Sequence, residues 1–333
     1  MLYLYLYYFL IIIFLKNYNY KEISMRKIAL SIILFSALIN AGEVEYGTGT
    51  FNMKGGFLGM TGSVGTDVDT FSYVERHSNL ASDFFYGYDF TWLDSQTLKQ
   101  AQHTYNGAAS TFNGFLGLGS NEYMKIPSMD YRVKGMDANI RVGYDVIHED
   151  ADNFLGIGAL VGLSMPWIDS SKSNSAAPSF DFIKDNAGNL LDAADYFQDT
   201  ETEVMTFKIG PTVTFQKSLI GNKLSVYGGA SYAYQTGYID NSLIDSSLTV
   251  NGTFQEYNLG LYFTPFTETF EWGWLSLSPR IYGTVGYKYS KWDVDEVAIN
   301  ISGFEMSSDM LSPLGMEFSM DSSVFYTGVG YSF

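Results

Sequence analysis

Apolar and polar residues alternate with a period of two over long stretches of the chain. From Met136 to Val146 every second residue is apolar, and Asp, Asn, Arg and Gly lie between them. A second run of this kind extends from Leu155 to Trp167. Successive side chains of a strand point to opposite faces, so the two runs predict strands that are apolar on one face only. The short polar segment 148–153 between them predicts a hairpin.

The same alternation recurs along the rest of the chain. It is clear in residues 83–92, 205–215, 224–234, 257–263, 275–289 and 324–333, and weaker in 42–63 and 67–76. Three segments interrupt it, at about 93–128, 168–203 and 291–317, and these predict long loops. Within the first of them, residues 94–102 fit a short helix with Asp94 or Ser95 as its N-cap.

The last strand carries the most specific signal. Counting back from the end, one face holds Phe333, Tyr331, Val329, Thr327 and Phe325, and the other face is mostly small. An aromatic edge strand would promote aggregation in a soluble protein. This segment resembles the closing strand of bacterial outer-membrane β-barrel proteins, which typically ends in Phe. The resemblance implies an all-β, transmembrane, antiparallel up-and-down barrel in the outer membrane of a Gram-negative bacterium, without indicating a functional subfamily.

The N-terminal region reads as a targeting sequence. Arg26 and Lys27 precede an apolar run from Ile28 to Leu38, and small residues around Ala41 form a cleavage site. We therefore interpret 25–41 as a signal peptide, 1–24 as a mis-called extension and 42–333 as one barrel domain. The apolar run in the first residues is shorter than the roughly 20 needed for a membrane-spanning helix.

The number of strands follows from parity. Bacterial outer-membrane barrels have an even number of strands, short periplasmic turns and longer outer loops. Eight strands fit from Asp83 onward, and the two weak N-terminal candidates bring the number to ten. We prefer ten strands, and eight with an N-terminal plug is the alternative.

Composition limits the functional classes. The chain has 26 Tyr, 25 Phe, 33 Gly and no Cys, which suits aromatic girdles and removes thiol catalysis and thiolate metal sites. Its mean hydropathy of -0.01 argues against a helical membrane protein. The net charge of -17 argues against a nucleic-acid partner. The expected partners are the lipid bilayer, lipopolysaccharide and, through the strand ending at Phe333, the barrel-assembly machinery.

A set of polar residues alternates with the lipid-facing positions and is therefore expected to line the lumen. Its members are Asp89, Asp137, Asn139, Arg141, Asp145, Lys208, Glu256, Arg280 and Lys288. An ionised group on the lipid side would cost about 2 to 4 kcal/mol near the midplane. A turn centred near residues 267–269 would place Glu256 opposite Arg280, so we expect a lumenal contact between them.

Few residues indicate catalysis or metal binding. His77 and His148 fall near predicted periplasmic turns, and His103 lies in the first long loop without a triad pattern. The Asp clusters near 150, 240 and 293 lack the spacing of a calcium loop, so solvated charge is the preferred interpretation. We expect no enzyme activity, no metal and no cofactor.

The sequence leaves three hypotheses for the function of the barrel. The first is a narrow channel or uptake protein for small solutes, and the sequence favours it slightly. The second is a structural or adhesive barrel with a closed, salt-bridged interior. The third, an outer-membrane enzyme, is disfavoured by the placement of the histidines.

Overall fold

The computed structural model describes residues 42–57, 60–79, 83–100, 103–106, 123–126, 129–147, 153–172, 200–221, 223–241, 244–265, 269–272, 275–277, 281–301, 304–306 and 317–331. The predicted extension and signal peptide, residues 1–41, lie outside these ranges, and so do Arg280, His148 and Phe333. Among the described residues no helix is long and apolar enough to span a membrane.

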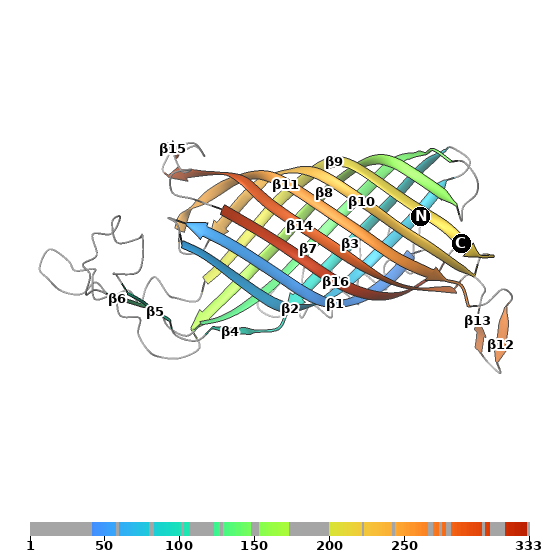
Figure 1. Ribbon diagram of the computed structural model, residues 1–333, viewed down its shortest axis with the longest axis horizontal. Helices are drawn as coiled ribbons and strands as arrows, with labels where there is room; N and C mark the ends of the chain where they lie inside the picture. Colours follow the sequence, from blue (N-terminus) through green and yellow to red (C-terminus); the bar gives the residue numbers. More distant parts are fainter. Residues whose placement is uncertain are drawn as a thin grey trace, which may run out of the picture. The chain divides into compact units, whose positions relative to one another are not determined.

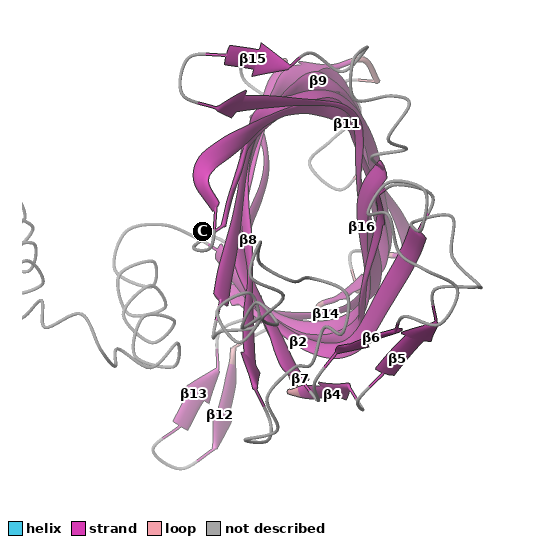
Figure 2. Cartoon of the chain, turned by 90° about the vertical axis from the view of Figure 1, so that its left-hand side faces the viewer, coloured by secondary structure: helices cyan, strands magenta, loops and turns pink. Residues whose placement is uncertain are grey.

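Ten long antiparallel strands form a closed ring in the described part of the chain (Figures 1 and 2). They are β1 (Gly42–Phe57), β2 (Met60–Asn79), β3 (Phe84–Ser95), β7 (Met129–Asp145), β8 (Phe154–Lys172), β9 (Thr200–Ile220), β10 (Leu224–Asn241), β11 (Ile244–Phe263), β14 (Ile281–Ile301) and β16 (Glu317–Tyr331). Each pairs with its neighbour, and the β1–β16 pair closes the ring. The prediction of ten strands is confirmed, and the eight-stranded alternative with a plug is wrong, because residues 42–79 form two wall strands.

Short strands extend from both ends of the barrel. One end carries β4 (Leu98–Gln100), β5 (His103–Asn106), β6 (Tyr123–Ile126) and β15 (Phe304–Met306), and the other carries β12 (Phe270–Trp272) and β13 (Leu275–Leu277) (Figure 1). Gly42 and Tyr331, the paired first and last residues of the wall, lie at the β12–β13 end. Both ends of the chain face the periplasm in such barrels, so this end is periplasmic and the other is the outer end.

Two sequence predictions about local structure are wrong. The helix expected at 94–102 is absent, because Asp94 and Ser95 continue β3 and Leu98–Gln100 pairs with β7 as β4. Ladder hydrogen bonds to β7 outweigh the weak helical preference of this segment. The loop expected from residue 291 does not begin there, because β14 continues to Ile301 and pairs with β11 and β15.

Along each strand, apolar residues change from the outward-facing positions to the inward-facing positions. In the periplasmic half, large apolar residues such as Ile140, Ile209 and Val285 are exposed on the outer surface, where acyl chains surround a membrane barrel. In the outer half, Phe51, Trp292 and Met320 point inward and are buried, while Asn52, Lys291 and Asp321 occupy the adjacent positions. The outer half is therefore patterned like a water-soluble barrel.

Most of the inward apolar residues of the outer half form one core, and Val250 and Val294 form a second, small cluster. The buried members of the core are Phe51, Val68, Leu93, Val133, Leu160, Ile168, Val204, Ala233, Phe254, Trp292, Met320 and Val324. The Trp292 ring lies 5.5 Å from the ring of Phe254 and 6.4 Å from that of Phe51, measured between centroids. These side chains, called the apolar core below, fill the ring of ribbons seen in Figure 2.

Candidate functional site: the charged lumen

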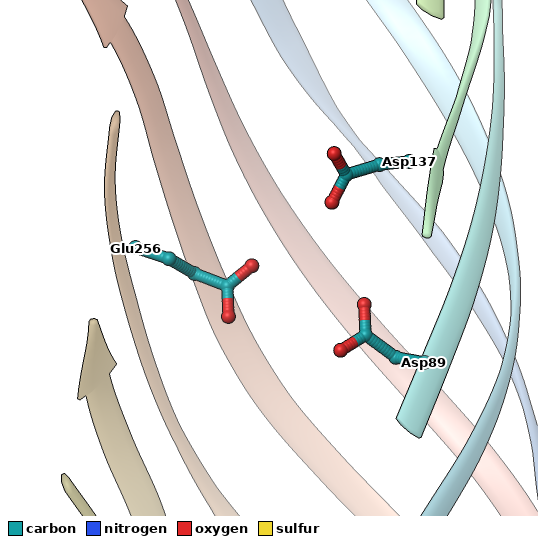
Figure 3. Close-up of side chains that lie close together, drawn as sticks. All are labelled: Asp89, Asp137 and Glu256. Carbon is teal, nitrogen blue, oxygen red and sulfur yellow. The ribbon is translucent and has the colours of Figure 1, made fainter. Parts of the chain in front are cut away.

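Three carboxylates meet inside the barrel on the periplasmic side of the apolar core. Asp89 comes from β3, Asp137 from β7 and Glu256 from β11, and Figure 3 shows their carboxyl groups converging. One oxygen of each lies within 4.8 Å of the others, and all three residues are buried. Asp89 and Asp137 each lie between two outward apolar or aromatic neighbours, and Glu256 lies between Gln255 and Tyr257, so the period-two pattern determines the inward direction of all three.

Three cations separate these carboxylates. Arg141 of β7 donates one hydrogen bond to Asp89 and a second to Glu256. The Lys208 Nζ of β9 lies 2.5 Å from Asp137 Oδ1. The Lys288 Nζ of β14 lies 3.2 Å from Asp89 Oδ2 and 3.1 Å from Glu256 Oε2. The charged network, as we call these six residues, is therefore neutral, and a neutral network can be buried at much lower cost than an unpaired charge.

Uncharged groups complete the network. The Asn139 amide donates to Asp137 at 2.6 Å and to Asp89 at 3.0 Å. Asp137 also accepts a hydrogen bond from the Ser164 hydroxyl. Lys208 has no exposed side-chain surface, and its Nζ lies 4.0 Å from the centroid of the Phe254 ring. A lysine at this distance from an aromatic face gains a cation–π attraction.

The carboxylate cluster fits an ion-pair network better than a metal centre. Hard cations such as Ca²⁺ prefer oxygen ligands, and three converging carboxylates would supply them. Here, however, every carboxylate of the set contacts an ammonium or a guanidinium. A divalent ion would have to displace these groups, and their positive charges would oppose its entry.

The network links opposite walls of the barrel. Strands β7 and β11, which contribute Arg141 and Glu256, are four strands apart in a ring of ten. On the outer side of the network, Trp292 Nε1 of β14 donates to Ser164 Oγ of β8 at 3.0 Å. These two strands are also four strands apart in the ring. On the periplasmic side, the hydroxyls of Tyr227 and Tyr326 lie 2.8 Å apart. Side chains from facing walls therefore meet at three levels of the lumen.

A small cavity lies on the periplasmic side of the network. Its volume is about 70 Å³, and its wall includes Glu45, Phe85, Thr212, Tyr227 and Asn258 together with residues of the network. The buried Asn258 Oδ1 has no hydrogen-bond partner among the described residues. A cavity of this size with polar groups in its wall has room for a few water molecules. The lumen thus contains, from the periplasm outward, a small cavity with both polar and apolar walls, a charged network and an apolar core.

The structure brings together most of the residues that the sequence assigned to the lumen. Asp89, Asp137, Asn139, Arg141, Lys208, Glu256 and Lys288 all contribute to the network. Asp145 is also buried, but it lies at the periplasmic end of β7, where its Oδ1 accepts from the amides of Ile147 and Leu155. Arg280 lies outside the described residues.

The register expected for Glu256 is wrong. Ser290, not a residue near 280, lies opposite it on β14. A turn centred near 267–269 was expected to join the two wall strands directly, whereas the connection between β11 and β14 contains the additional hairpin β12–β13. Glu256 instead contacts Arg141 and Lys288.

Sequence reasoning missed the apolar core. It assigned polar side chains to the lumen throughout, whereas Phe51, Leu93 and Trp292 point inward. The sequence did contain a signal. Charged Lys291 and Asp293 flank Trp292, so if the charged side chains face outward, the Trp292 side chain must face inward. Of the histidines, His77 lies in β2 and His103 in β5, and His148 lies outside the described residues.

Comparison with known proteins gives no family and no function. No family model matches the chain, and no curated protein sequence is significantly similar to it. Among solved structures, the outer membrane protease OmpT of Escherichia coli aligns at 9% identity with a TM-score of 0.45, covering 89% of this chain and 98% of its own. The translocator domain of the autotransporter NalP from Neisseria meningitidis aligns at 10% identity and a TM-score of 0.34, covering 93% and 95%.

The closed ring of ten strands with an apolar outer band decides the class of the protein. The protein is an integral outer-membrane β-barrel. The outer membrane protein OprG from Pseudomonas aeruginosa aligns at 12% identity and a TM-score of 0.30, over 88% of this chain and 97% of its own. TM-scores this low carry no argument about the activity of this barrel.

Proposed function

We propose that this outer-membrane barrel is a structural protein whose closed interior holds its outer segments at the cell surface. The observation that carries the proposal is the ion pair between Arg141 and Glu256, which joins opposite walls in the middle of the lumen. Side chains from different walls that meet at three levels of the lumen would stiffen the barrel and narrow its interior, which supports a structural role.

The charge balance supports this proposal over the solute channel. A conducting pore needs unpaired polar groups around water, because an ion must exchange its hydration shell for groups in the wall. In the charged network all three cations contact carboxylates, and the next level outward is apolar. The channel, with the charged residues as its lining, remains the second candidate, and the small cavity beside the network favours it to a smaller extent.

Planar-bilayer recordings of the refolded protein test the proposal. The wild-type barrel should give no conductance steps at any voltage that the bilayer tolerates. A matched variant, Lys288→Ser, removes one cation from the lumen and serves to identify any current that passes through it. Steps in the wild type whose size or ion selectivity changes in Lys288→Ser would contradict the structural role and favour the channel.

The partners expected from the sequence also remain proposals. The bilayer is the medium in which the apolar outer band would lie. We expect lipopolysaccharide around the outer end, and the barrel-assembly machinery at the strand β16 during insertion. Crosslinking from a residue introduced in β16 during assembly would test the second expectation.

A further inference from the structure

The cavity on the periplasmic side of the charged network has an aromatic wall that glycines make possible. Gly260 of β11 and Gly286 of β14 pair in the ladder. Tyr227 of β10 is the other partner of Gly260, and a Cβ on this glycine would lie 2.5 Å from the tip of the tyrosine ring. Tyr326 of β16 lies over Gly286 in the same way. The two hydroxyls meet at 2.8 Å, so both rings lie close to the barrel wall and present aromatic surface to the cavity.

The opposite wall of the cavity is aromatic for the same reason. Strand β3, which carries Phe85, is five strands from β11 in the ring of ten. A Cβ on Gly143 of β7 or on Gly156 of β8 would lie within 2.5 Å of the Phe85 ring, so this ring also lies along the wall. Phe154 of β8 packs beside it, with 6.4 Å between the ring centroids. Both aromatic walls line the cavity of about 70 Å³.

Hydrogen-bond acceptors occur between these aromatic walls. Glu45 of β1 is 5% exposed and lies on the inner face of Gly328, whose Cβ would come 3.0 Å from the Glu45 Cγ. The Asn258 Oδ1 of β11 is buried and has no hydrogen-bond partner among the described residues. Glu256 of the same strand belongs to the network and also lines the cavity (Figure 3). A buried acceptor without a donor costs free energy, so a ligand that donates to Asn258 would be stabilised.

The residues of the cavity wall carry more negative than positive charge. The acidic residues of the wall are Glu45, Glu75, Asp89 and Glu256, and the basic residues are Arg141 and Lys288. Both basic residues contact the two carboxylates of the network that line the cavity. The excess of negative charge favours a cation in the cavity over an anion.

We propose that the cavity binds a small primary ammonium ion that enters from the periplasm. An ammonium group can donate to Glu45 and to the Asn258 Oδ1, and the rings of Tyr227 and Tyr326 supply a cation–π attraction. The aromatic walls distinguish this site from one for an inorganic cation, which prefers to be surrounded by oxygen ligands. The volume of the cavity limits the ligand to a few non-hydrogen atoms.

The cavity lies close to the periplasmic rim. Phe154 is the first residue of β8, and Gln216, which also belongs to the wall, lies near the periplasmic end of β9. The charged network and the apolar core lie on its outer side. Binding in such a blind cavity needs no passage through the barrel. The proposal therefore goes beyond the structural role, and either of the two can fail without the other.

Ligand-observed NMR with ethylammonium chloride tests the proposal on the refolded full-length barrel in a non-ionic detergent. Ethanol, which has the same number of non-hydrogen atoms but no charge, and potassium chloride are the competing probes at constant ionic strength. Glu45→Gln removes a carboxylate from the cavity, and Asn258→Asp adds one. Asp69→Asn, on the exposed outer surface of β2, is the matched control for the change of charge. Heat modifiability in gel electrophoresis shows whether each variant is folded.

Saturation transfer from the protein to ethylammonium should give a dissociation constant that neither ethanol nor K⁺ changes. Glu45→Gln should raise this constant about tenfold, because one charge-assisted hydrogen bond is lost. Asn258→Asp should lower it, because the acceptor gains a charge. Asp69→Asn should change it by less than about twofold, because solvent and salt screen an exposed charge.

Two results in the wild-type protein would overturn the proposal, and they do not depend on the folding of any variant. One is the absence of saturation transfer to ethylammonium, and the other is its displacement by an equal concentration of ethanol or K⁺. An equal effect of Glu45→Gln and Asp69→Asn would also overturn it, because ethylammonium would then respond only to the net charge of the barrel.

Discussion

Arg141 on β7 and Glu256 on β11 are separated by 115 residues in sequence and face each other from opposite walls of the barrel, and they form an ion pair in its interior. The same guanidinium holds Asp89, so one side chain connects three strands of the ring. This arrangement is specific enough that changes to single residues of the network have predictable consequences.

Removing Arg141 should strongly destabilise the barrel. In Arg141→Ala, Asp89 and Glu256 retain only Lys288 as a cationic partner, and two carboxylates would then share one positive charge. Breaking a buried ion pair typically costs about 3 to 5 kcal/mol. We expect the free energy of unfolding, measured by urea titration in detergent micelles, to fall by about 3 kcal/mol.

Arg132→Ala is the matched control for that variant. Arg132 makes a bidentate pair with Asp94 on the outer surface, and its side chain is 44% exposed. Exposed ion pairs contribute about 0 to 1 kcal/mol. An equal loss in the two arginine variants would show that burial of the lumenal pair does not matter.

The pair Lys208–Asp137 should show strong energetic coupling. Either single variant, Lys208→Met or Asp137→Asn, leaves an uncompensated charge in a buried position. In the double variant both charges are absent, so the destabilisation should be about 1 to 3 kcal/mol smaller than the sum of the two single effects. Urea unfolding of the four proteins measures this coupling, and additive effects would disprove it.

Water should reach the periplasmic cavity but not the apolar core. Thr214 lines the cavity, and Val204, on the same strand β9, is buried in the core. In the cysteine-free background, Thr214→Cys should react with a small charged thiol reagent in folded protein, while Val204→Cys should react at least tenfold more slowly. Similar rates at both positions would indicate a continuous aqueous path.

Close packing of tyrosine on glycine should make Gly286 intolerant of a side chain. A Cβ at this position would lie 2.5 Å from the ring and hydroxyl of Tyr326 and 2.8 Å from the Leu259 carbonyl. Overpacking of this kind typically costs about 1 to 3 kcal/mol, so Gly286→Ala should lower the free energy of unfolding by this amount.

Gly283→Ala is the control on the same strand. Its Cβ would meet only the Gly328 carbonyl, at 3.7 Å, which is an ordinary contact. We expect a change below about 0.5 kcal/mol in urea unfolding, as for a surface substitution. If Gly286→Ala behaves in the same way, the tyrosine ring does not constrain the wall.

Much of the fold could be predicted from local pattern. Ile140, Arg141 and Val142 illustrate why: each side chain's direction depends only on its position in a strand, and lipid on one side makes that direction unambiguous. The prediction that Phe325, Val329 and Tyr331 share the lipid-facing side of the last strand is confirmed for these described residues.

The contacts inside the lumen could not be predicted in this way. Which carboxylate meets Arg141 depends on the stagger of all ten strands, and one misplaced turn changes every partner. The hairpin β12–β13 had this effect on Glu256, whose opposite residue is Ser290. The apolar core was missed for two other reasons. Phe51 was taken as part of an alternation whose apolar face is always outward, and Trp292 was assigned to the long loop expected at 291–317, whereas both side chains point into the barrel.

The seam between β1 and β16 has a consequence for how the molecule is made. Residues of the network come from strands early and late in the chain, and the pairs of Lys288 with Asp89 and of Glu256 with Arg141 can form only when distant strands curl toward each other. Until β1 and β16 pair and close the barrel, these ionised groups would remain in contact with solvent or an assembly factor. Biogenesis of this polypeptide should therefore be slow until the final pairing and cooperative thereafter, with desolvation of the interior as a late event.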